Sequence, residues 1–233
     1  MKLPLSKRLL ACCSFVAPGD RVADIGCDHG YLGIYLLTNG IASSVIAADI
    51  NQQPLDSALH NAHKYGTADK MRFYLSDGVC NIPRDFDTLV CAGVGGDTMI
   101  SILEAAPWLR NSCYRLILQC QSKTSMLRKF LSENGWRIAE ETVLRDGRFL
   151  YTVMEVIWQP EHPRLTVGQW YVPPALLENP AKELPEYYAR TVFRLRRAVN
   201  SRGEQADLEM VTALKELEAL VLRPELKWLE ESK

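Results

Sequence analysis

The stretch that decides the fold is Arg21-Val-Ala-Asp-Ile-Gly-Cys-Asp-His-Gly-Tyr31. Its apolar run ends abruptly in a glycine-containing turn, and residues with helical spacing follow from Tyr31 onward. A strand, a tight turn and a helix N-terminus in succession form the place where α/β proteins hold a small ligand. Gly26 and Gly30 permit a bend and a close backbone approach that a side chain would block. The stretch therefore predicts a cofactor site.

The composition is that of an ordinary globular chain, with 233 residues, 47% hydrophobic and 24% charged. The net charge of −1 excludes a global basic field, so any contact with nucleic acid has to use local patches. The seven cysteines include no Cys-x-x-Cys pair, which indicates reduced thiols. No apolar run reaches about 18 residues and no cleavage site is recognisable. We expect a soluble, cytoplasmic, monomeric protein that makes no membrane contact.

Apolar runs and helical patterns alternate along the first two thirds of the chain. After a helix over 3–16, strands are expected at 21–25, 45–50, 71–75, 86–92 and 114–118, with helices between them. Two longer alternating strands, 136–144 and 149–158, follow as a hairpin. This order predicts a Rossmann-like α/β fold, a seven-stranded doubly wound sheet with one antiparallel strand at its edge.

The last third of the chain has a different character. Residues 159–185 are rich in proline and are expected to form a connector held by Trp170 and Tyr171. A 4-3-4 spacing of apolar residues then predicts an antiparallel helical hairpin with a coiled-coil-like seam, formed by Tyr188, Val192, Leu195 and Val199 against Met210, Leu214, Leu217 and Val221. The chain thus divides into a cofactor-binding catalytic domain over 1–160 and a connector with a helical hairpin over 161–233.

Acidic residues at the ends of the first three strands indicate the ligand. Asp28 stands where the dinucleotide fingerprint needs its second glycine, and a carboxylate facing a pyrophosphate would repel it. An anionic turn suits a cation, and the sulfonium and amino group of S-adenosylmethionine qualify. Asp49 can accept hydrogen bonds from both ribose hydroxyls, and Asp77 can accept a hydrogen bond from the adenine amino group. The alternative for Asp49 and Asp77 is capping of the next helix.

Several motifs extend this interpretation to a family. They are Leu5-Ser-Lys-Arg-Leu9, Ala23-Asp-Ile-Gly-Cys-Asp-His-Gly-Tyr-Leu32, Asp77-Gly78, Ala92-Gly-Val-Gly-Gly96, Leu116-Ile-Leu-Gln119 and Tyr151-Thr-Val-Met-Glu155. On these the chain resembles the class I S-adenosylmethionine-dependent methyltransferases, and more narrowly the bacterial TrmK family of tRNA (adenine-22-N1) methyltransferases. The expected cofactor site comprises Asp24, Gly26, Cys27, His29, Gly30, Asp49, Ile50, Asp77, Gly78, Ala92 and Gly93.

The chain also departs from the family pattern. The family usually has Ser and Ala where Cys27 and Gly30 stand, Pro at Gly33, Glu at Asp49, Met at Val94 and Pro-Asn at Cys120-Gln121. The last of these changes falls on the expected substrate side.

Methyl transfer to adenine N1 needs alignment, proximity and relief of the charge that forms on the ring, and it needs no metal. We expect no metal site. A carboxylate that accepts from the exocyclic amino group would assist, and Asp28 is the candidate catalytic residue, the alternative being a structural or cofactor-binding role. Tyr31 could stack on the base or pack at the helix start, and His29 could assist or bond to backbone. Gly95 and Gly96 would let a flat base approach, after extrusion if the base is paired.

Basic residues offer contacts for tRNA phosphates, namely Lys7, Arg8, Arg128, Lys129, Arg190, Arg194, Arg196, Arg197 and Arg202. The alternative for the hairpin arginines is pairing with the acidic second arm, which carries Glu204, Asp207, Glu209, Glu216 and Glu218. Two rival functions stay open. One is a methyltransferase of this fold that acts on a small molecule or a protein, and the other is a non-catalytic RNA-binding protein.

Overall fold

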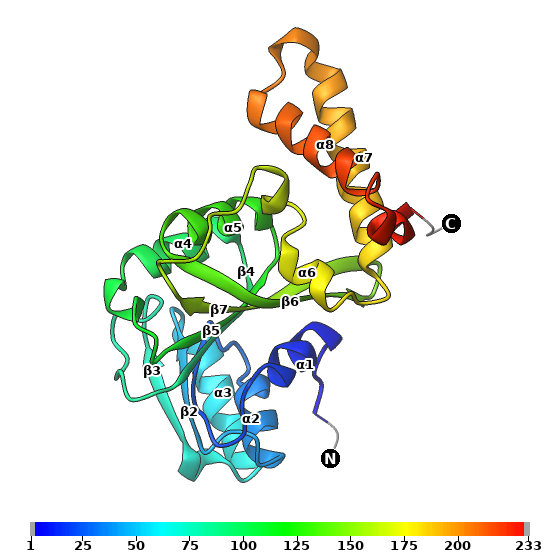
Figure 1. Cartoon of the computed structure of the whole chain (residues 1–233). Coiled ribbons are helices and arrows are strands. Elements are labelled where there is room, and N and C mark those ends of the chain that lie inside the picture. The colour runs from blue at the N-terminus through cyan, green and yellow to red at the C-terminus, as the bar shows by residue number, and fades with distance from the viewer. Residues whose placement is uncertain (1–2, 231–233) are drawn as a thin grey trace.

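The computed structural model describes residues 3–230, and Figure 1 shows their arrangement. A seven-stranded sheet has the order β3-β2-β1-β4-β5-β7-β6. Its strands are β1 (Arg21–Ile25), β2 (Ser44–Asp49), β3 (Met71–Leu75), β4 (Thr88–Val94), β5 (Arg115–Cys120), β6 (Trp136–Asp146) and β7 (Phe149–Trp158). The helices of this part are α1 (Lys7–Ser14), α2 (Tyr31–Thr38), α3 (Gln52–Lys64), α4 (Gly96–Glu104) and α5 (Thr124–Glu133). The predicted doubly wound α/β fold is confirmed.

The reversed strand does not lie where the sequence predicted it. β7 runs antiparallel to both β5 and β6, so it lies inside the sheet, and the prediction of a reversed strand at the edge is wrong. The residues Val153, Met154 and Val156 of β7 are buried on both faces, which suits an interior strand covered on two sides. The loop Gly147-Arg148 is only two residues long and pairs β6 with β7, so β6 becomes the edge.

The first helix is shorter than the predicted span 3–16. The side chain of Ser6 accepts a hydrogen bond from the backbone N–H of Leu9, and the helix begins at Lys7 behind this cap. It ends at Ser14.

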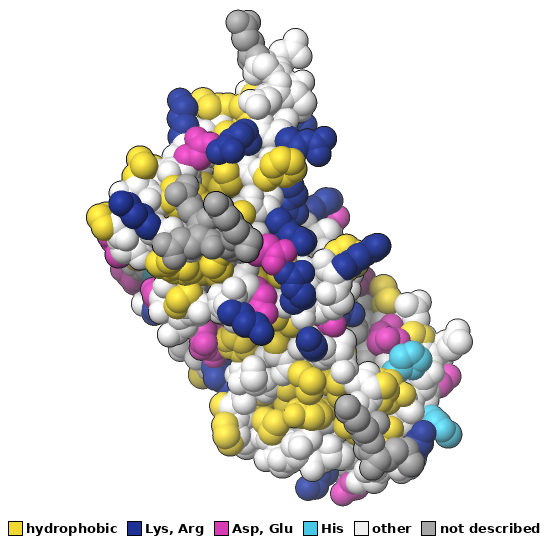
Figure 2. Space-filling view, turned by 90° about the vertical axis from the view of Figure 1, so that its right-hand side faces the viewer, with side chains coloured by type: hydrophobic (Ala, Val, Ile, Leu, Met, Phe, Trp, Pro, Cys, Tyr) yellow, Lys and Arg dark blue, Asp and Glu magenta, His cyan; other side chains and the backbone are white. Residues whose placement is uncertain are grey.

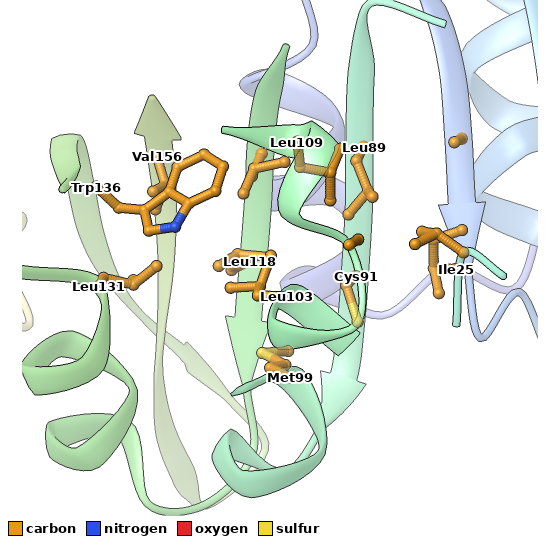
Figure 3. Packing of buried hydrophobic residues seen from close by; sticks show 14 of the residues in the cluster. Ile25, Leu89, Cys91, Met99, Leu103, Leu109, Leu118, Leu131, Trp136 and Val156 are labelled. Carbon is orange, nitrogen blue, oxygen red and sulfur yellow. The ribbon is translucent and has the colours of Figure 1, made fainter. Parts of the chain in front are cut away.

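Helices cover both faces of the sheet, with α1, α2 and α3 on one face and α4 and α5 on the other (Figure 1). Successive residues of the inner strands therefore enter two different cores. Leu89 and Cys91 of β4 pack with Met99 of α4, whereas Val90 between them packs with Cys12 of α1. Figure 3 shows the first of these cores. Full burial of an aliphatic side chain contributes about 1.5–3 kcal/mol, so an interior strand is apolar throughout.

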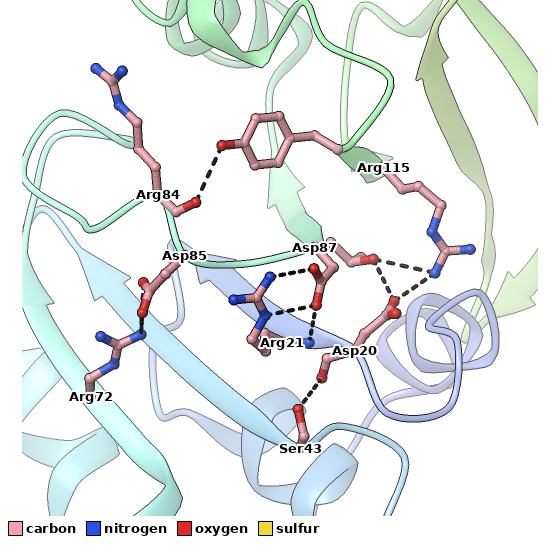
Figure 4. A network of polar contacts seen from close by, with 10 residues as sticks. Asp20, Arg21, Ser43, Arg72, Arg84, Asp85, Asp87 and Arg115 are labelled. Carbon is pink, nitrogen blue, oxygen red and sulfur yellow. Dashed lines mark hydrogen bonds and ion pairs between the residues drawn. The ribbon is translucent and has the colours of Figure 1, made fainter.

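Ion pairs tie the amino edge of the sheet (Figure 4). Arg115 of β5 contacts Asp20 at 2.6 Å and Glu155 of β7 at 3.0 Å, and Arg21 of β1 contacts Asp87 at 2.6 Å. These contacts join the starts of β1, β4 and β5. The predicted site lies at the opposite, carboxyl edge of the same strands.

The C-terminal part follows the predicted plan. The connector holds only short helical segments among the described residues, η3 (Gly168–Trp170) and α6 (Pro174–Glu178). The helices α7 (Leu184–Arg202) and α8 (Leu208–Leu220) then form a hairpin that projects from the sheet (Figure 1). Tyr188 and Leu195 of α7 are buried against Leu217 of α8, and the Tyr188 hydroxyl donates to the Leu217 carbonyl at 2.8 Å. Within residues 3–230, no helix has the length and apolar character needed to cross a bilayer.

A buried ion pair joins this hairpin to the sheet. The Arg128 guanidinium of α5 donates to both carboxylate oxygens of Glu141 on β6, at 2.6 and 3.1 Å, and both side chains are fully buried. Arg128 also donates to the backbone carbonyls of Trp170 and Tyr171 and contacts the Tyr187 hydroxyl of α7 at 3.2 Å. The prediction that Arg128 binds phosphate is wrong, because its donors are all directed at internal partners.

The substitution Arg128→Met should lower the free energy of unfolding by about 3–5 kcal/mol, because it leaves the Glu141 carboxylate buried without a counter-charge. Urea denaturation at pH 7 measures this. Adding Glu141→Leu to the variant should restore a large part of the loss. The control Arg72→Met removes an exposed pair with Asp85 and should cost no more than about 1 kcal/mol. An equal loss in the two single variants would contradict the assignment.

Candidate cofactor and substrate site

Backbone bonds fix the turn between β1 and α2 against the end of β2. The N–H groups of Gly26 and Cys27 both donate to the Ala48 carbonyl, at 2.8 and 2.9 Å. Gly30 has a φ of +70°, and a Cβ there would lie 2.9 Å from the Cβ of Ala58 on α3. In this chain glycine therefore allows this left-handed conformation and this close approach of α3 without strain. The sequence predicted both roles for Gly30.

Asp24 lies beneath this turn as a buried carboxylate. Its side chain is 3% exposed, and its Oδ2 atom has no hydrogen-bond partner among the described residues. Burial, opposed by the Gly33 N–H bond and reinforced by the charges of Asp49 and Asp28, raises the pKa of Asp24 to about 7. A buried polar atom without a partner is costly, so this carboxylate is suited to a cationic ligand. The amino group and sulfonium of S-adenosylmethionine fit that requirement.

Asp49 is the last residue of β2 and connects two loops. Its Oδ2 accepts from the Asp28 N–H at 3.2 Å, and its Oδ1 accepts from the Asn51 N–H at 2.9 Å. The second bond is to Asn51, the residue before α3, so Asp49 does not cap that helix, and the first bond reaches back to the glycine turn. Asp49 therefore positions the turn and can also face a ligand. The next residue, Ile50, is 61% exposed, which leaves an apolar side chain open beside this carboxylate.

The tip of the turn is open. Asp28 has a φ of +50° and a side chain that is 72% exposed, with its Oδ1 atom 3.6 Å from the Nε2 of His29. The ring of Tyr31 lies 5.8 Å from the ring of His29 and makes an edge contact with Tyr65. Asn61 of α3 donates to the His29 carbonyl at 3.1 Å. The predicted carboxylate, imidazole and phenol thus lie together at the surface of the turn.

Asn61 was missed by the sequence reasoning. It is 9% exposed and interrupts the apolar face of its helix between Ala58 and Ala62. A polar residue at an apolar position of an amphipathic helix was the available signal.

The remaining strand ends adjoin the turn, because β3, β2, β1 and β4 are successive neighbours in the sheet. Asp77 is exposed after β3, and Gly78 packs so closely that a Cβ would lie 2.9 Å from Ile102. On β4, Ala92 and Gly93 are half-buried. Gly96 follows and bonds through its N–H to the Ser122 carbonyl at 2.9 Å, with the half-buried Gly95 before it. The sheet therefore brings the predicted cofactor residues to one edge.

A buried glutamine connects β4 to the first helix. The Gln119 side chain is fully buried, and its Oε1 accepts from the Gly93 N–H at 3.1 Å and from Arg8 Nη1 at 3.2 Å. The Arg8 guanidinium also lies 5.9 Å from the centre of the Tyr151 ring. Arg8 thus reaches the sheet edge, whereas Lys7 is exposed on α1. Gln119 belongs to one of the quoted motifs but was not predicted as a site residue. The sequence does not show which groups a single amide at a strand end will contact.

The hairpin arginines have mixed environments. Arg190 pairs with Glu186 of its own helix at 2.6 Å, and Glu186 also contacts Arg145 of β6. Arg196 pairs with Glu218 of α8 at 2.7 Å, and Lys129 of α5 pairs with Glu209 at 2.6 Å. Arg194 and Arg197 have no carboxylate partner among the residues described, and the side chain of Glu204 lies outside them. Pairing with the acidic arm therefore accounts for Arg196 and Lys129 and leaves Arg194 and Arg197 among the cations available to a ligand.

The environment of Cys27 does not suit a nucleophilic thiol. It is 7% exposed, and burial, followed by the charges of Asp24 and Asp49, raises the pKa of its thiol. A thiol that stays protonated is a poor nucleophile.

This fold and site define a class I methyltransferase, with an acidic glycine turn after β1 and one reversed strand inside a seven-stranded sheet. Residues 5–154 match the family model described as a methyltransferase domain. The chain belongs to this family and, within it, to the TrmK group.

Individual relatives agree with this placement. A Bacillus subtilis tRNA (adenine(22)-N(1))-methyltransferase is 32% identical over 154 residues, which cover 66% of this chain and 65% of the relative. The crystal structure of the B. subtilis M1A22 tRNA methyltransferase TrmK superposes with a TM-score of 0.77 at 26% identity, covering 98% of this chain and 99% of that one.

Sp1610 of Streptococcus pneumoniae, solved in complex with S-adenosyl-L-methionine, gives a TM-score of 0.80 at 27% identity and covers 91% and 99% of the two chains. The sequence match spans less than two thirds of the length of two curated relatives, 65% of the B. subtilis enzyme and 61% of a Mycoplasma genitalium protein named as a putative tRNA methyltransferase. The family model ends at residue 154, whereas the superposition on the B. subtilis structure covers 98% of this chain and so includes the hairpin.

The substitution Asp24→Asn should have opposite effects on the stability of the fold and on cofactor binding. Because the folded-state pKa of about 7 lies above the usual 3.8, the folded protein holds a proton that the unfolded chain releases. This group's contribution to stability therefore falls as pH rises from about 4 to about 7. At pH 8 the variant should be more stable than the parent by about 1–3 kcal/mol, with the difference shrinking at pH 5. Urea denaturation at the two pH values measures it.

The same variant should bind S-adenosylmethionine at least about tenfold more weakly at pH 8, since a buried charge–charge contact is lost. Calorimetric titration measures this. The parent's affinity should rise from pH 6 to pH 8 and the variant's should stay flat. Unchanged affinity in Asp24→Asn would remove this carboxylate from the cofactor site.

Proposed function

We propose that the protein methylates N1 of an adenosine in tRNA, with position 22 as the target and S-adenosylmethionine as the methyl donor. The observation that carries the proposal is the unpartnered Oδ2 atom of the buried Asp24 carboxylate, beneath a turn whose exposed tip presents Asp28. The activity named for the B. subtilis relative supports the choice of tRNA and of the N1 atom. The fold supports two working parts, a catalytic domain over 1–160 and a connector with a hairpin over 161–233. The protein acts in this scheme as a monomer.

The cofactor residues lie at the ends of four strands, and each group of residues binds a different part of the cofactor. Asp24 and the backbone of Gly26, Cys27, His29 and Gly30 hold the cationic end, Asp49 and Ile50 hold the ribose, and Asp77 with Gly78 holds the adenine amino group. Ala92 and Gly93 form the wall beside the sulfur. The bound cofactor supplies an electrophilic methyl group. The protein aligns the methyl group with the target atom, and it provides a site in which no other cation competes for the acidic residues.

Asp28 acts on the target base. Its exposed carboxylate accepts a hydrogen bond from the exocyclic amino group of adenine, which raises electron density at N1 and then offsets the positive charge on the ring. The Asp28 backbone is fixed by the Asp49 contact at 3.2 Å, so the carboxylate is presented without a large ordering cost. Tyr31 stacks on the base, and Gly95 and Gly96 leave room for its approach. His29, 3.6 Å from Asp28, keeps that carboxylate in place.

The RNA backbone is held by basic groups on two parts of the chain. Figure 2 shows Lys and Arg side chains gathered in a run along one face of the molecule. Lys7 and Arg8 bind from α1, and Arg194 and Arg197 bind from α7. Arg190, which already pairs with Glu186, makes the weakest contribution.

Asp28→Ala should lower kcat for methyl transfer to bulk tRNA by about 100-fold or more, because it removes a group that acts on the reacting base. The dissociation constant for S-adenosylmethionine should change less than about threefold, since Asp28 does not hold the cofactor. Asp69→Ala, which removes another exposed carboxylate, is the matched control. Full activity in Asp28→Ala would end the proposed role, and a methylated nucleoside other than 1-methyladenosine in the parent reaction would refute the target atom.

Arg194→Gln and Arg197→Gln should each weaken tRNA binding and reduce the slope of log K against log salt by about 1. Arg84→Gln, at the amino edge of the sheet, is the matched control and should leave the slope unchanged. Filter binding across a salt series measures the slopes. Slopes equal to the parent's in both hairpin variants would place the RNA elsewhere.

A further inference from the structure

A cavity of about 380 Å³ lies between the sheet domain and the hairpin. Its floor is the loop Cys120–Thr124 after β5, one wall is Leu150–Thr152 of β7, and the other wall is α7, with Thr191, Arg194 and Ala198. The volume falls within the range of small-ligand sites, roughly 300–1,000 Å³. None of the cofactor residues described above lines it.

The charges around this cavity are of one sign. Its described lining includes Lys123, Arg128 and Arg194 and no Asp or Glu. Lys123 pairs with Asp97 at 2.9 Å and Arg128 with Glu141, so two of the cations are already compensated. Arg194 remains without a carboxylate in the part of the chain that the structure describes. An uncompensated guanidinium at the mouth of a cavity without acids suits a phosphate.

The rest of the lining suits a base and a sugar. Tyr151, Tyr171 and Tyr187 present aromatic rings, which stack on nucleobases without regard to sequence. Thr152 and Thr191 line opposite walls, are 3% and 4% exposed, and have hydroxyls without a partner among the described residues. A χ1 rotation exchanges the hydroxyl with the methyl group and offers a hydrogen bond to a ligand.

The cavity is joined to the target side of the catalytic site. The Gln121 N–H donates to the Val94 carbonyl at 2.9 Å, and the Ser122 carbonyl accepts from Gly96 at 2.9 Å. The floor of the cavity and the glycine loop after β4 are therefore one bonded unit. A ligand in the cavity would lie beside the base that approaches Gly95 and Gly96, and on the opposite side of β4 from the acids of β1 to β3.

From these observations we propose that the cavity binds one nucleotide of the RNA chain next to the target adenosine, with its phosphate at Arg194 and its base among the tyrosines. The proposal rests on the proposed function for the identity of the neighbouring target. Binding there would use the hairpin and the sheet domain together, so that the flanking nucleotide holds the target base in register with the methyl donor.

Ala198→Phe tests this by filling the cavity from α7 without removing a charge. In methyl transfer to tRNA at saturating S-adenosylmethionine, the KM for tRNA should rise about tenfold, while the dissociation constant for the cofactor stays within about twofold. Ala219→Phe places the same side chain at an exposed position of α8 and should leave both values unchanged. Thr191→Val, a milder change on the same wall, should raise the KM about threefold. Adenosine 5′-monophosphate should compete with tRNA in the parent and lose that effect in Ala198→Phe.

A second measurement separates this proposal from the methyltransferase assignment. Filter binding of tRNA reports on the cavity even if the parent transfers no methyl group, and the affinity should fall about tenfold in Ala198→Phe. Parent activity on tRNA with an unchanged KM and an unchanged tRNA affinity in Ala198→Phe would overturn the cavity proposal alone. Loss of tRNA affinity in Ala198→Phe without transfer by the parent would support the cavity and overturn the methyltransferase assignment.

Discussion

The Arg128–Glu141 pair is the interaction on which the arrangement of the molecule depends. A fully buried guanidinium is tolerated only where every donor has a partner, and here the partners come from β6, the connector and α7. The bonds to the carbonyls of Trp170 and Tyr171 fix a proline-rich segment that has little regular structure of its own. The contact with Tyr187 then sets where α7 leaves the sheet. Without this pair the hairpin wall of the cavity would be held to the sheet only by weaker contacts, such as the Arg145–Glu186 pair and the packing of Val143.

The two halves of the sheet carry opposite charges at the same edge. On the half formed by β1, β2 and β3, Asp24, Asp49 and Asp77 follow or end the strands. On the half that begins at β4, the polar groups include amides, hydroxyls and the cations Arg8 and Lys123, and the carboxylate of Asp97 there is paired with Lys123. A cation on the first half and a polyanion on the second are the ligands that this division favours. The glycines after β4 lie at the boundary, where the two ligands would meet.

The sheet could be predicted because its signals are local. A strand buried on both faces is apolar throughout; β1, β2 and β4 each show such a run before a glycine or an acid, and β5 shows one before Gln119. The position of β7 inside the sheet could not be predicted, because the pairing of β5 with β7 joins residues about 40 apart and leaves no spacing pattern. The two-residue loop at Gly147 fixes the pairing of β6 with β7. It does not fix which of these two strands pairs with β5.

The candidate site also contains residues that could be predicted from the sequence and residues that could not. The acids and glycines of the turn could be found because the conformation of one short segment demands them. Arg128 was misassigned because a basic residue on a helix gives no indication of its partner, and Glu141 and the Trp170 carbonyl come from distant segments. The cavity beside Arg194 could not be seen at all, since its floor, two walls and charge balance exist only after the hairpin has docked. Because the cavity forms only where the hairpin packs on the sheet, a single substitution at Ala198 can change the cavity while the fold of each of these two parts is kept.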